Sequence, residues 1–241
     1  MTIRLRSVLC LLPLLVAATT QAAEKELRYL LPNSVRPAVL LPAPPSLGSD
    51  EYKAEIDLIL AIQATRTPVQ IQRFLAQDTV GLASFASVLP NRCTPENLPK
   101  LNKLLKAAVS DSKYFGNFAK DYFQRKRPYR EDSRVQPLGQ RDDECAYPSG
   151  HATRGLLCAT ILAELEPSRA GKLLERGREI GWDRVIGGVH HPSDIAAGRV
   201  LGLAVARAIL KSPAFQTDLQ EAKAEYEALK KSDTRQPALA H

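Results

Sequence analysis

The segment YPSGHATRGLLCATIL, residues 147–162, joins a helix start to an apolar helix face. Ser149 is a residue type that caps helices. Apolar residues then recur at three- and four-residue spacing, which predicts a helix. Backbone N–H groups and the positive dipole end at such a start attract an anion. The segment therefore predicts a helix that begins at Ser149 and is able to receive an anion.

Three residues of this segment suit an anion bound there. Ser149 supplies a hydroxyl, Gly150 lets an oxyanion approach the backbone closely, and His151 could donate a proton to a leaving oxygen. The alternative is a capped helix with an incidental histidine. The segment alone does not decide between the two.

A basic cluster lies upstream, where Lys120 is followed after six residues by Arg127-Pro128. Seven residues are about two helical turns, so we expect both cations on one helix face, with Pro128 ending that helix. A guanidinium forks two hydrogen bonds to phosphate oxygens, and lysine adds a mobile point charge. Because neighbouring residues are also basic, a solvated helix face is the alternative.

A third cluster lies downstream: Arg184, five residues, His190, three residues and Asp194. A carboxylate at that distance can hold the Nδ1–H of the imidazole and leave Nε2 free as a nucleophile. The rival interpretation is a metal site of His190, His191 and Asp194. Because the chain has only four histidines, that site would also need His151.

The remaining sequence predicts one helical domain behind an export signal. Residues 1–22 carry arginines and then an apolar run too short to span a bilayer, which is typical of a signal peptide. Residues 23–48 are a Pro-rich extended arm, 49–232 the helical domain and 233–241 a tail. No later apolar stretch is long enough for a membrane span, so we expect a soluble, exported protein.

Apolar spacing and helix-start residues place the helices inside this domain. Thr94 is the expected cap, and Pro95 the first residue, of the long helix that carries Lys120. Residues 129–146 are polar and predict a surface loop. The expected helices cover residues 51–64, 68–88, 95–127 and 213–230, with further helices from Ser149, after Pro167, and from Ser193 or Asp194. For the helix over 95–127, a break near Asp111 or Gly116 is the alternative to one continuous helix.

Charge and cysteine content narrow the function classes. The formal charge is +7, of which the signal carries two, so the mature chain carries about +5. That charge fits an anionic substrate or a solvated basic surface. The sequence has no basic stripe interleaved with aromatic residues, which is the pattern that would indicate nucleic-acid binding. Three cysteines remain after cleavage and allow three disulfide pairings; we favour Cys93 with Cys145 and expect Cys158 to be a buried thiol.

Taken together, K-x6-RP, PSGH and R-x5-H-x3-D resemble the three-part signature of the type 2 phosphatidic acid phosphatase superfamily, which includes the vanadium haloperoxidases. YPSGH, RVIGGVHHPSDIAAGR and SPAFQTDLQEAKAEYEA look most like the bacterial class A non-specific acid phosphatases, which are secreted, soluble and helical. The resemblance covers roughly residues 90–230. It implies an all-α, single-domain helical bundle of the acid phosphatase/vanadium haloperoxidase type.

The resemblance also implies a mechanism. His190 would attack phosphorus, Asp194 would orient its imidazole, and His151 would protonate the leaving alcohol and then activate water. The phosphate would be held by Lys120, Arg127, Ser149, Gly150 and Arg184. These cations would make a metal or other cofactor unnecessary. We therefore expect a periplasmic acid phosphatase acting on small-molecule phosphate monoesters with broad tolerance; a homodimer is an expectation from the resemblance alone.

Two departures and three rivals accompany this interpretation. Asp183 stands where the family usually has serine, and we expect its carboxylate to point away from phosphate and pair with a cation. His191-Pro192 replaces the more usual His-Trp-Gln pattern. The rivals are a vanadium haloperoxidase, a soluble lipid-phosphate phosphatase and a catalytically inert phosphate-binding protein.

Overall fold

The computed structural model describes residues 27–235, with side chains as far as residue 232, and contains only helices, turns and loops over that range. The expected signal peptide and the end of the expected tail lie outside it. The last helix, α9 (Pro213–Arg235), runs three residues past the predicted domain boundary at 232. The all-α fold class is confirmed.

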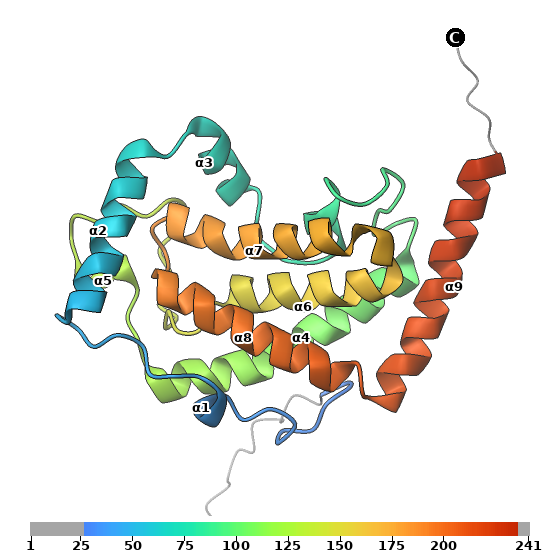
Figure 1. Cartoon of the computed structure of the whole chain (residues 1–241), viewed down its shortest axis with the longest axis horizontal. Helices are drawn as coiled ribbons and strands as arrows, with labels where there is room; N and C mark the ends of the chain where they lie inside the picture. The colour runs from blue at the N-terminus through green and yellow to red at the C-terminus, as the bar shows by residue number, and fades with distance from the viewer. Residues whose placement is uncertain (1–26, 236–241) are drawn as a thin grey trace, which may run out of the picture.

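Three helices form the centre of the bundle: α6 (Gly150–Leu165), α7 (Ala170–Ile186) and α8 (Pro192–Ile209). They run side by side in Figure 1, with α6 packed most extensively against the other two. The long helix α4 (Pro99–Phe123) packs on α6 and α9, and α9 crosses one end of the bundle. The start of α6, the end of α7 and the start of α8 therefore meet at the opposite end of the bundle, on the left in Figure 1.

The contact between α6 and α8 is close enough to need glycine. A Cβ at Gly202 would lie 2.4 Å from the carbonyl oxygen of Thr153. Only a residue without a side chain fits against a neighbouring backbone at that distance. This approach fixes the first turns of α6 against α8 and so holds the starts of the two helices together.

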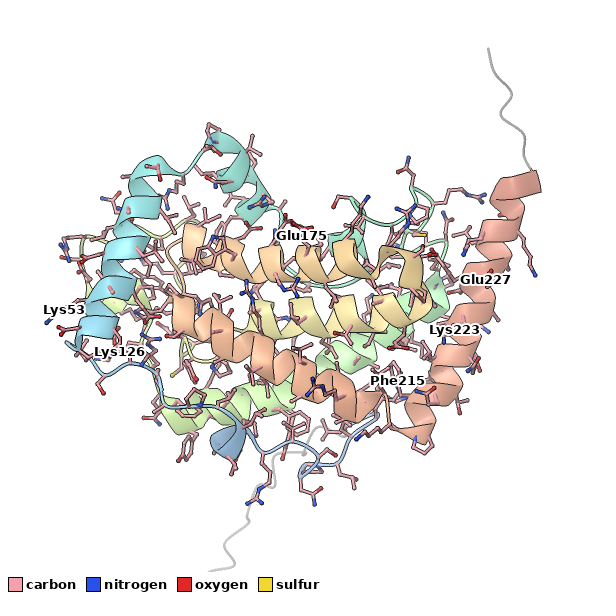
Figure 2. All side chains as sticks on the ribbon, in the orientation of Figure 1. Lys53, Lys126, Glu175, Phe215, Lys223 and Glu227 are labelled. Carbon is pink, nitrogen blue, oxygen red and sulfur yellow. The ribbon has the colours of Figure 1, made fainter. Side chains whose placement is uncertain are left out.

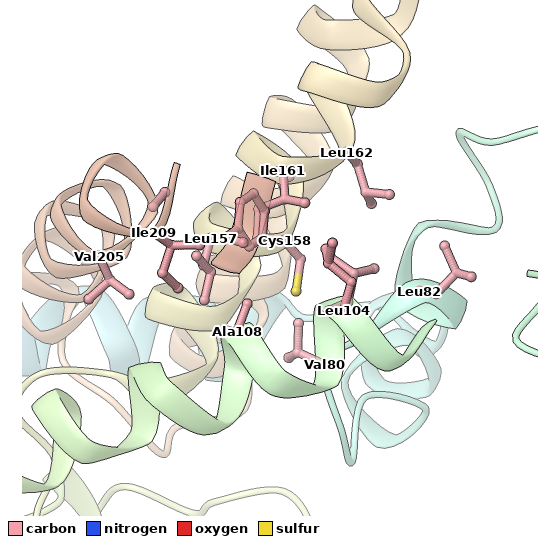
Figure 3. Close-up of a cluster of buried hydrophobic side chains, with 14 of the residues drawn as sticks. Val80, Leu82, Leu104, Ala108, Leu157, Cys158, Ile161, Leu162, Val205 and Ile209 are labelled. Carbon is pink, nitrogen blue, oxygen red and sulfur yellow. The ribbon is translucent and has the colours of Figure 1, made fainter. Parts of the chain in front are cut away.

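Apolar side chains from four regions fill the main core (Figure 3). Those from α4, α6 and α8 are fully or almost fully buried, and Cys158 is among them as the sequence predicts. Burial of each leucine, isoleucine or valine among them contributes roughly 1.5–3 kcal/mol. The labelled members are Val80, Leu82, Leu104, Ala108, Leu157, Cys158, Ile161, Leu162, Val205 and Ile209.

The predicted N-terminal arm runs along the lower edge of the bundle in Figure 1 and includes one turn of helix, α1 (Pro37–Leu40). Buried Asp111 of α4 anchors the arm because its carboxylate accepts the backbone N–H groups of residues 28, 29 and 30. The Tyr29 ring meets Phe215 edge-on at 5.2 Å. Figure 2 shows Phe215 at the beginning of α9, with Lys223 and Glu227 farther along that helix.

The helix predicted over residues 68–88 is wrong. The structure has α2 (Asp50–Thr65), α3 (Pro68–Leu75) and then a separate 3₁₀ turn, η1 (Leu82–Phe85). Residues 77–81 leave helical structure, and Gln77 instead makes long-range hydrogen bonds with its side chain and its carbonyl. These tertiary contacts override the local apolar spacing.

Both predicted ends of the long helix are also wrong. Thr94 caps only a turn, by accepting the N–H of Asn97, and α4 begins at Pro99. Pro99 has no N–H to donate back to residue 95, so a helix from Pro95 would lack that bond. The helix stops at Phe123, where Gln124 takes a left-handed conformation (φ 48°). Pro128 does not end α4 but begins the one-turn helix α5 (Pro128–Glu131).

The predicted Cys93–Cys145 disulfide is absent, since Cys145 and Cys158 are reduced thiols. Cys93 precedes α4, whereas Cys145 lies near its far end, next to Ala146, whose N–H bonds to Arg125. A helix of 25 residues is roughly 37 Å long. A disulfide tolerates a Cα separation of at most about 7 Å.

Candidate active site

A cavity of about 890 Å³ is lined by residues of α3, α4, α6 and the end of α7, together with the loops between them. Of the eight site residues predicted from the sequence, six line it; they are Lys120, Arg127, Gly150, His151, Arg184 and His190. Asp194 lies behind His190 and is fully buried, and Ser149 is also fully buried. The structure thus gathers three distant sequence clusters around one cavity.

His190 lies in the turn between α7 and α8 and is held from both sides. Its Nδ1 is 3.1 Å from Oδ2 of Asp194, and its Nε2 is 2.9 Å from Nη1 of Arg127. A guanidinium only donates, so Nε2 is the unprotonated acceptor and Nδ1 carries the proton. Burial and the Arg127 charge lower the pKa of His190 to about 3. The ring is therefore neutral, with its lone pair at Nε2.

Asp194 is fixed by donors on both carboxylate oxygens. Besides the imidazole of His190, it accepts the backbone N–H of His191 at 2.8 Å and Nη1 of Arg125 at 2.7 Å. Burial alone would raise the pKa of Asp194, but the hydrogen bonds from His190 and His191 hold it well below its usual range. The carboxylate therefore stays charged and oriented toward His190.

Arg125 is a site residue that the sequence interpretation missed. It is buried, and its guanidinium links Asp194 to Glu55 of α2, with 2.7 Å to each carboxylate. Glu55 in turn accepts the N–H of Ser193 at the start of α8. Arg125 looked like one of several basic surface residues because it follows the end of α4, where no periodic pattern predicts which way a side chain points.

His191 does not join His190 at the cavity. Its ring nitrogens lie 3.4 Å from Oδ2 of Asp194 and 3.4 Å from Oε2 of Glu131, in a fully buried position beside Tyr52. Burial opposes the charged ring, yet Asp194 and Glu131 raise its pKa. In the part of the chain that the structure describes, no three His, Cys, Asp or Glu side chains are grouped so that they could hold a metal ion.

Lys120 and Arg127 reach the cavity from different elements, so the predicted shared helix face is wrong. Lys120 belongs to the last turn of α4, whereas Arg127 is four residues beyond that helix and immediately precedes α5. Arg127 is held there because it also donates to the carbonyl oxygens of Val189 at 2.9 Å and Glu144 at 3.0 Å. The two cations still converge on one site.

Arg184, in the last turn of α7, presents a half-buried guanidinium to the cavity. Its Nε has no hydrogen-bond partner in the described structure, and the Phe74 ring lies 4.2 Å from its central carbon. Burial, Arg127 and Arg154 lower its pKa to about 10. Gly187 permits this stacking because a Cβ there would lie 2.2 Å from the Phe74 ring. A guanidinium whose Nε is buried without a partner is suited to an incoming anion.

His151 lies in the first turn of α6. Its Nε2 is 3.1 Å from the carbonyl oxygen of Gln77, which only accepts, so Nε2 carries the proton. Its Nδ1 is 3.4 Å from Nη2 of Arg154. Burial together with Arg184 and Arg154 lowers the pKa of His151 to about 2. His151 is therefore neutral in this arrangement.

Arg154 is a second cavity residue that sequence interpretation missed. It is one helical turn after His151, so the same helical spacing that placed His151 could have placed Arg154 beside it. Ser149 behaves as the predicted cap, because its hydroxyl accepts the N–H of Ala152 at 3.4 Å. That hydroxyl is buried beneath the cavity and does not line it.

Asp183 points away from the cavity, as the sequence predicts. Its buried carboxylate receives a forked pair of hydrogen bonds from Arg73, of which the shortest is 2.6 Å, and another of 2.6 Å from Gln77. The carboxylate before Arg184 is thus paired with a cation on α3 and does not repel a phosphate.

Acidic residues of the loop before α6 engage two of the cations. Glu144 pairs with Lys120, and Asp142 lies 2.9 Å from the Arg127 guanidinium. Both carboxylates are more than half exposed. The two cations themselves are mostly buried, so a phosphate that took the place of these carboxylates would keep the buried charges paired.

Comparisons with known proteins show which family the chain resembles. Residues 103–218 match the PAP2 superfamily. The chain is 29% identical over 223 residues to a non-specific acid phosphatase of Salmonella typhimurium, with 89% of each chain covered. It is 31% identical over 215 residues to a non-specific acid phosphatase of Providencia stuartii. That alignment covers 84% of this chain and 86% of the Providencia protein.

Among solved structures, a transmembrane PAP2 type phosphatidylglycerolphosphate phosphatase from Bacillus subtilis overlaps 68% of this chain and 87% of its own, at 16% identity and a TM-score of 0.49. None of the helices between residues 27 and 235 is both long and apolar enough to cross a membrane.

Proposed function

The chain belongs to the PAP2 superfamily as an acid phosphatase of the class A type, and we propose that it hydrolyses phosphate monoesters through a phosphohistidine on His190, without a metal ion. The observation that supports this most directly is the state of His190. Its proton faces Asp194, and its Nε2 lone pair faces a cavity lined by cations. A neutral imidazole held in this tautomer is an activated nucleophile.

Phosphate binding in this proposal rests on positive charge from four elements. Lys120, Arg127 and Arg184 take the non-bridging oxygens, helped by the N–H of Gly150 at the start of α6. Arg154 adds a further cation. When a phosphate oxygen accepts the Arg127 N–H that now points at His190, the Nε2 lone pair is released for attack. Ser149 contributes by capping α6 and not by touching phosphate.

The chemical step is an in-line displacement. Nε2 of His190 forms a bond to phosphorus while the ester P–O bond breaks, and the leaving oxygen takes a proton from His151. Water then attacks phosphorus, the P–N bond breaks and His151 accepts the proton from water. Catalysis is mostly positioning and charge stabilisation, which the buried cations provide in place of a metal ion. Asp194 keeps the imidazole of His190 in register throughout.

A bound phosphate also reconciles His151 with its role as an acid. In the arrangement described, Arg184 and Arg154 help to hold its pKa near 2. A phosphate dianion between these cations offsets their charge and raises the pKa of His151. The acid is then protonated only when substrate is present. Acidic working conditions follow, because the protonated acid is lost as pH rises.

Hydrolysis of p-nitrophenyl phosphate by wild type and His190→Ala, in EDTA, tests the proposal. We expect metal-free turnover by the wild type and a loss of at least about 10³-fold in the variant. A radiolabelled phosphoenzyme that is stable in alkali and labile in acid should form in the wild type only. Full activity of His190→Ala would sink the nucleophile assignment. Loss of wild-type activity in EDTA would sink the metal-free mechanism.

The cellular setting and assembly are part of the proposal. The basic and apolar residues at 1–22 support export to the periplasm. Small-molecule esters are the proposed substrates, and a homodimer stays an expectation. Protein sequencing of the exported form should find an N-terminus close to residue 23, and an intact Met1 would contradict export through a cleaved signal.

A further inference from the structure

The buried ion pair at Asp183 connects the end of α7 that carries Arg184 to the cavity wall formed by the end of α3 and Gln77. Its two oxygens accept from Nε and Nη2 of Arg73 at 2.6–3.0 Å and from Nε2 of Gln77 at 2.6 Å. Asp183 itself is fully buried, and Arg73 is about one third exposed. A forked arginine–carboxylate pair fixes geometry as well as contributing energy.

The two residues that donate to Asp183 lie next to, or include, groups that contact the active-site residues Arg184 and His151. Phe74, next to Arg73, stacks on the Arg184 guanidinium at 4.2 Å. The carbonyl of Gln77 accepts the Nε2–H of His151 at 3.1 Å. Residues 77–81 have no regular secondary structure, although the N–H of Gln77 still bonds to the carbonyl oxygen of Phe74 at 3.1 Å. Side-chain contacts such as those to Asp183 therefore hold this wall in place.

We propose that Asp183 is a positioning residue for the acid His151, acting through Arg73 and Gln77 to fix the carbonyl that orients the imidazole. The inference rests on the proposed function, because it needs His151 to protonate the leaving oxygen. It explains how a carboxylate is accommodated directly before Arg184: the group serves the leaving-group side of the cavity and faces away from the phosphate side.

The role predicts selectivity for leaving groups. p-Nitrophenolate departs with little help from an acid, whereas the alkoxide of an alkyl phosphate needs a proton. The quantity to compare is kcat/KM for p-nitrophenyl phosphate and for glycerol phosphate, because it covers the steps up to departure of the leaving group. In Asp183→Ser we expect a loss of about 10- to 100-fold on glycerol phosphate and within about threefold on p-nitrophenyl phosphate.

Inorganic phosphate as a competitive inhibitor reports on the cations separately. Its inhibition constant should stay within about twofold in Asp183→Ser, since the hydrogen bonds of the Asp183 carboxylate go to Arg73 and Gln77 and not to a phosphate-binding group. Glu179→Ser is the matched control. Glu179 is a carboxylate one turn earlier on α7 that pairs with Arg176 at 3.0 Å and is about two fifths exposed. That variant should treat both substrates as the wild type does.

Gln77→Met keeps the test decisive if Asp183→Ser fails to fold. It removes the side-chain bond to Asp183 while leaving the Gln77 carbonyl and the ion pair in place, so a smaller selective loss on glycerol phosphate is expected. Equal losses on both substrates, no loss in folded variants, or weakened phosphate inhibition would overturn the inference. A wild type that hydrolyses neither ester would instead refute the proposed function.

Discussion

At the residue scale, two neutral histidines face one cavity in different surroundings. His190 has Asp194 behind it, which orients the ring, while burial and the Arg127 charge lower its pKa and keep it unprotonated in acid. Burial, Arg184, Arg154 and His190 lower the pKa of His151 and the Gln77 carbonyl raises it, so no carboxylate is among the groups that shift it. The difference separates the two roles, since each pKa is set by its own neighbours.

Arg154→Met should move the alkaline limb of the kcat profile to higher pH. Arg154 lowers the pKa of His151, so removing its charge raises that pKa in the enzyme–substrate complex. A protonated acid then persists to a higher pH. The measurement is kcat against pH on an alkyl phosphate, with Arg178→Met, an exposed position of α7, as the control. A limb that stays in place or moves to lower pH would contradict this account.

The sequence predicted the residues that carry charge or chemistry in a fixed spacing, but not those that hold them. Lys120, His190 and Asp194 stand in motifs whose spacing is visible in the chain. Arg125 acts through Glu55, 70 residues away, and no local pattern encodes a contact over that separation. Ser149 was assigned to phosphate because a hydroxyl at a helix start can face either an anion or its own backbone.

At the scale of elements, the close contact of α6 with α8 is the most demanding. Gly202→Ala would drive a Cβ to within 2.4 Å of the Thr153 carbonyl, so the helices must move apart. Overpacking of this kind costs about 1–3 kcal/mol. We expect a lower urea midpoint, and reduced kcat because His151 and Asp194 lie on the two helices that separate.

Gly171→Ala is the control for that substitution. It also replaces a helical glycine, but no atom lies within 4 Å of the added Cβ. Alanine there should stabilise α7 by up to about 1 kcal/mol, because glycine loses more backbone entropy on folding. If both variants shift the urea midpoint in the same direction, the close contact between α6 and α8 is not the reason that position 202 needs glycine.

Helix existence was easier to predict than helix ends. The apolar spacing identified α2, α6 and α9 with starts within one residue of those observed. It placed the start of α4 four residues early because Thr94-Pro95 and Leu98-Pro99 both offer a proline at a helix start. It extended α3 to residue 88 because nothing local shows that Gln77 bonds to Asp183 and His151.

At the scale of the whole molecule, the titratable groups of the site make the stability of the fold depend on pH. His151 and His190 have pKa values of about 2 and 3 when folded, against about 6.5 when unfolded. Below pH 6.5 the two histidines therefore bind protons in the unfolded chain but not in the folded protein. The free energy of unfolding falls as pH falls. Asp194, with its lowered pKa, loses its contribution only near pH 4 and below. His191, with its raised pKa, contributes fully below pH 6.5 and loses this as pH rises through its folded pKa.

The expected outcome is a urea midpoint that falls between pH 6.5 and pH 4.5 in phosphate-free buffer. Each proton that only the unfolded chain binds changes the free energy of unfolding by up to roughly 1.4 kcal/mol per pH unit. His151→Gln removes one of the two protons, so its midpoint should depend less steeply on pH than that of the wild type. Inorganic phosphate, which binds the folded cavity, should raise the wild-type midpoint at every pH in this window. Equal pH dependence in His151→Gln and wild type would show that the cavity histidines do not set the acid limit of the fold.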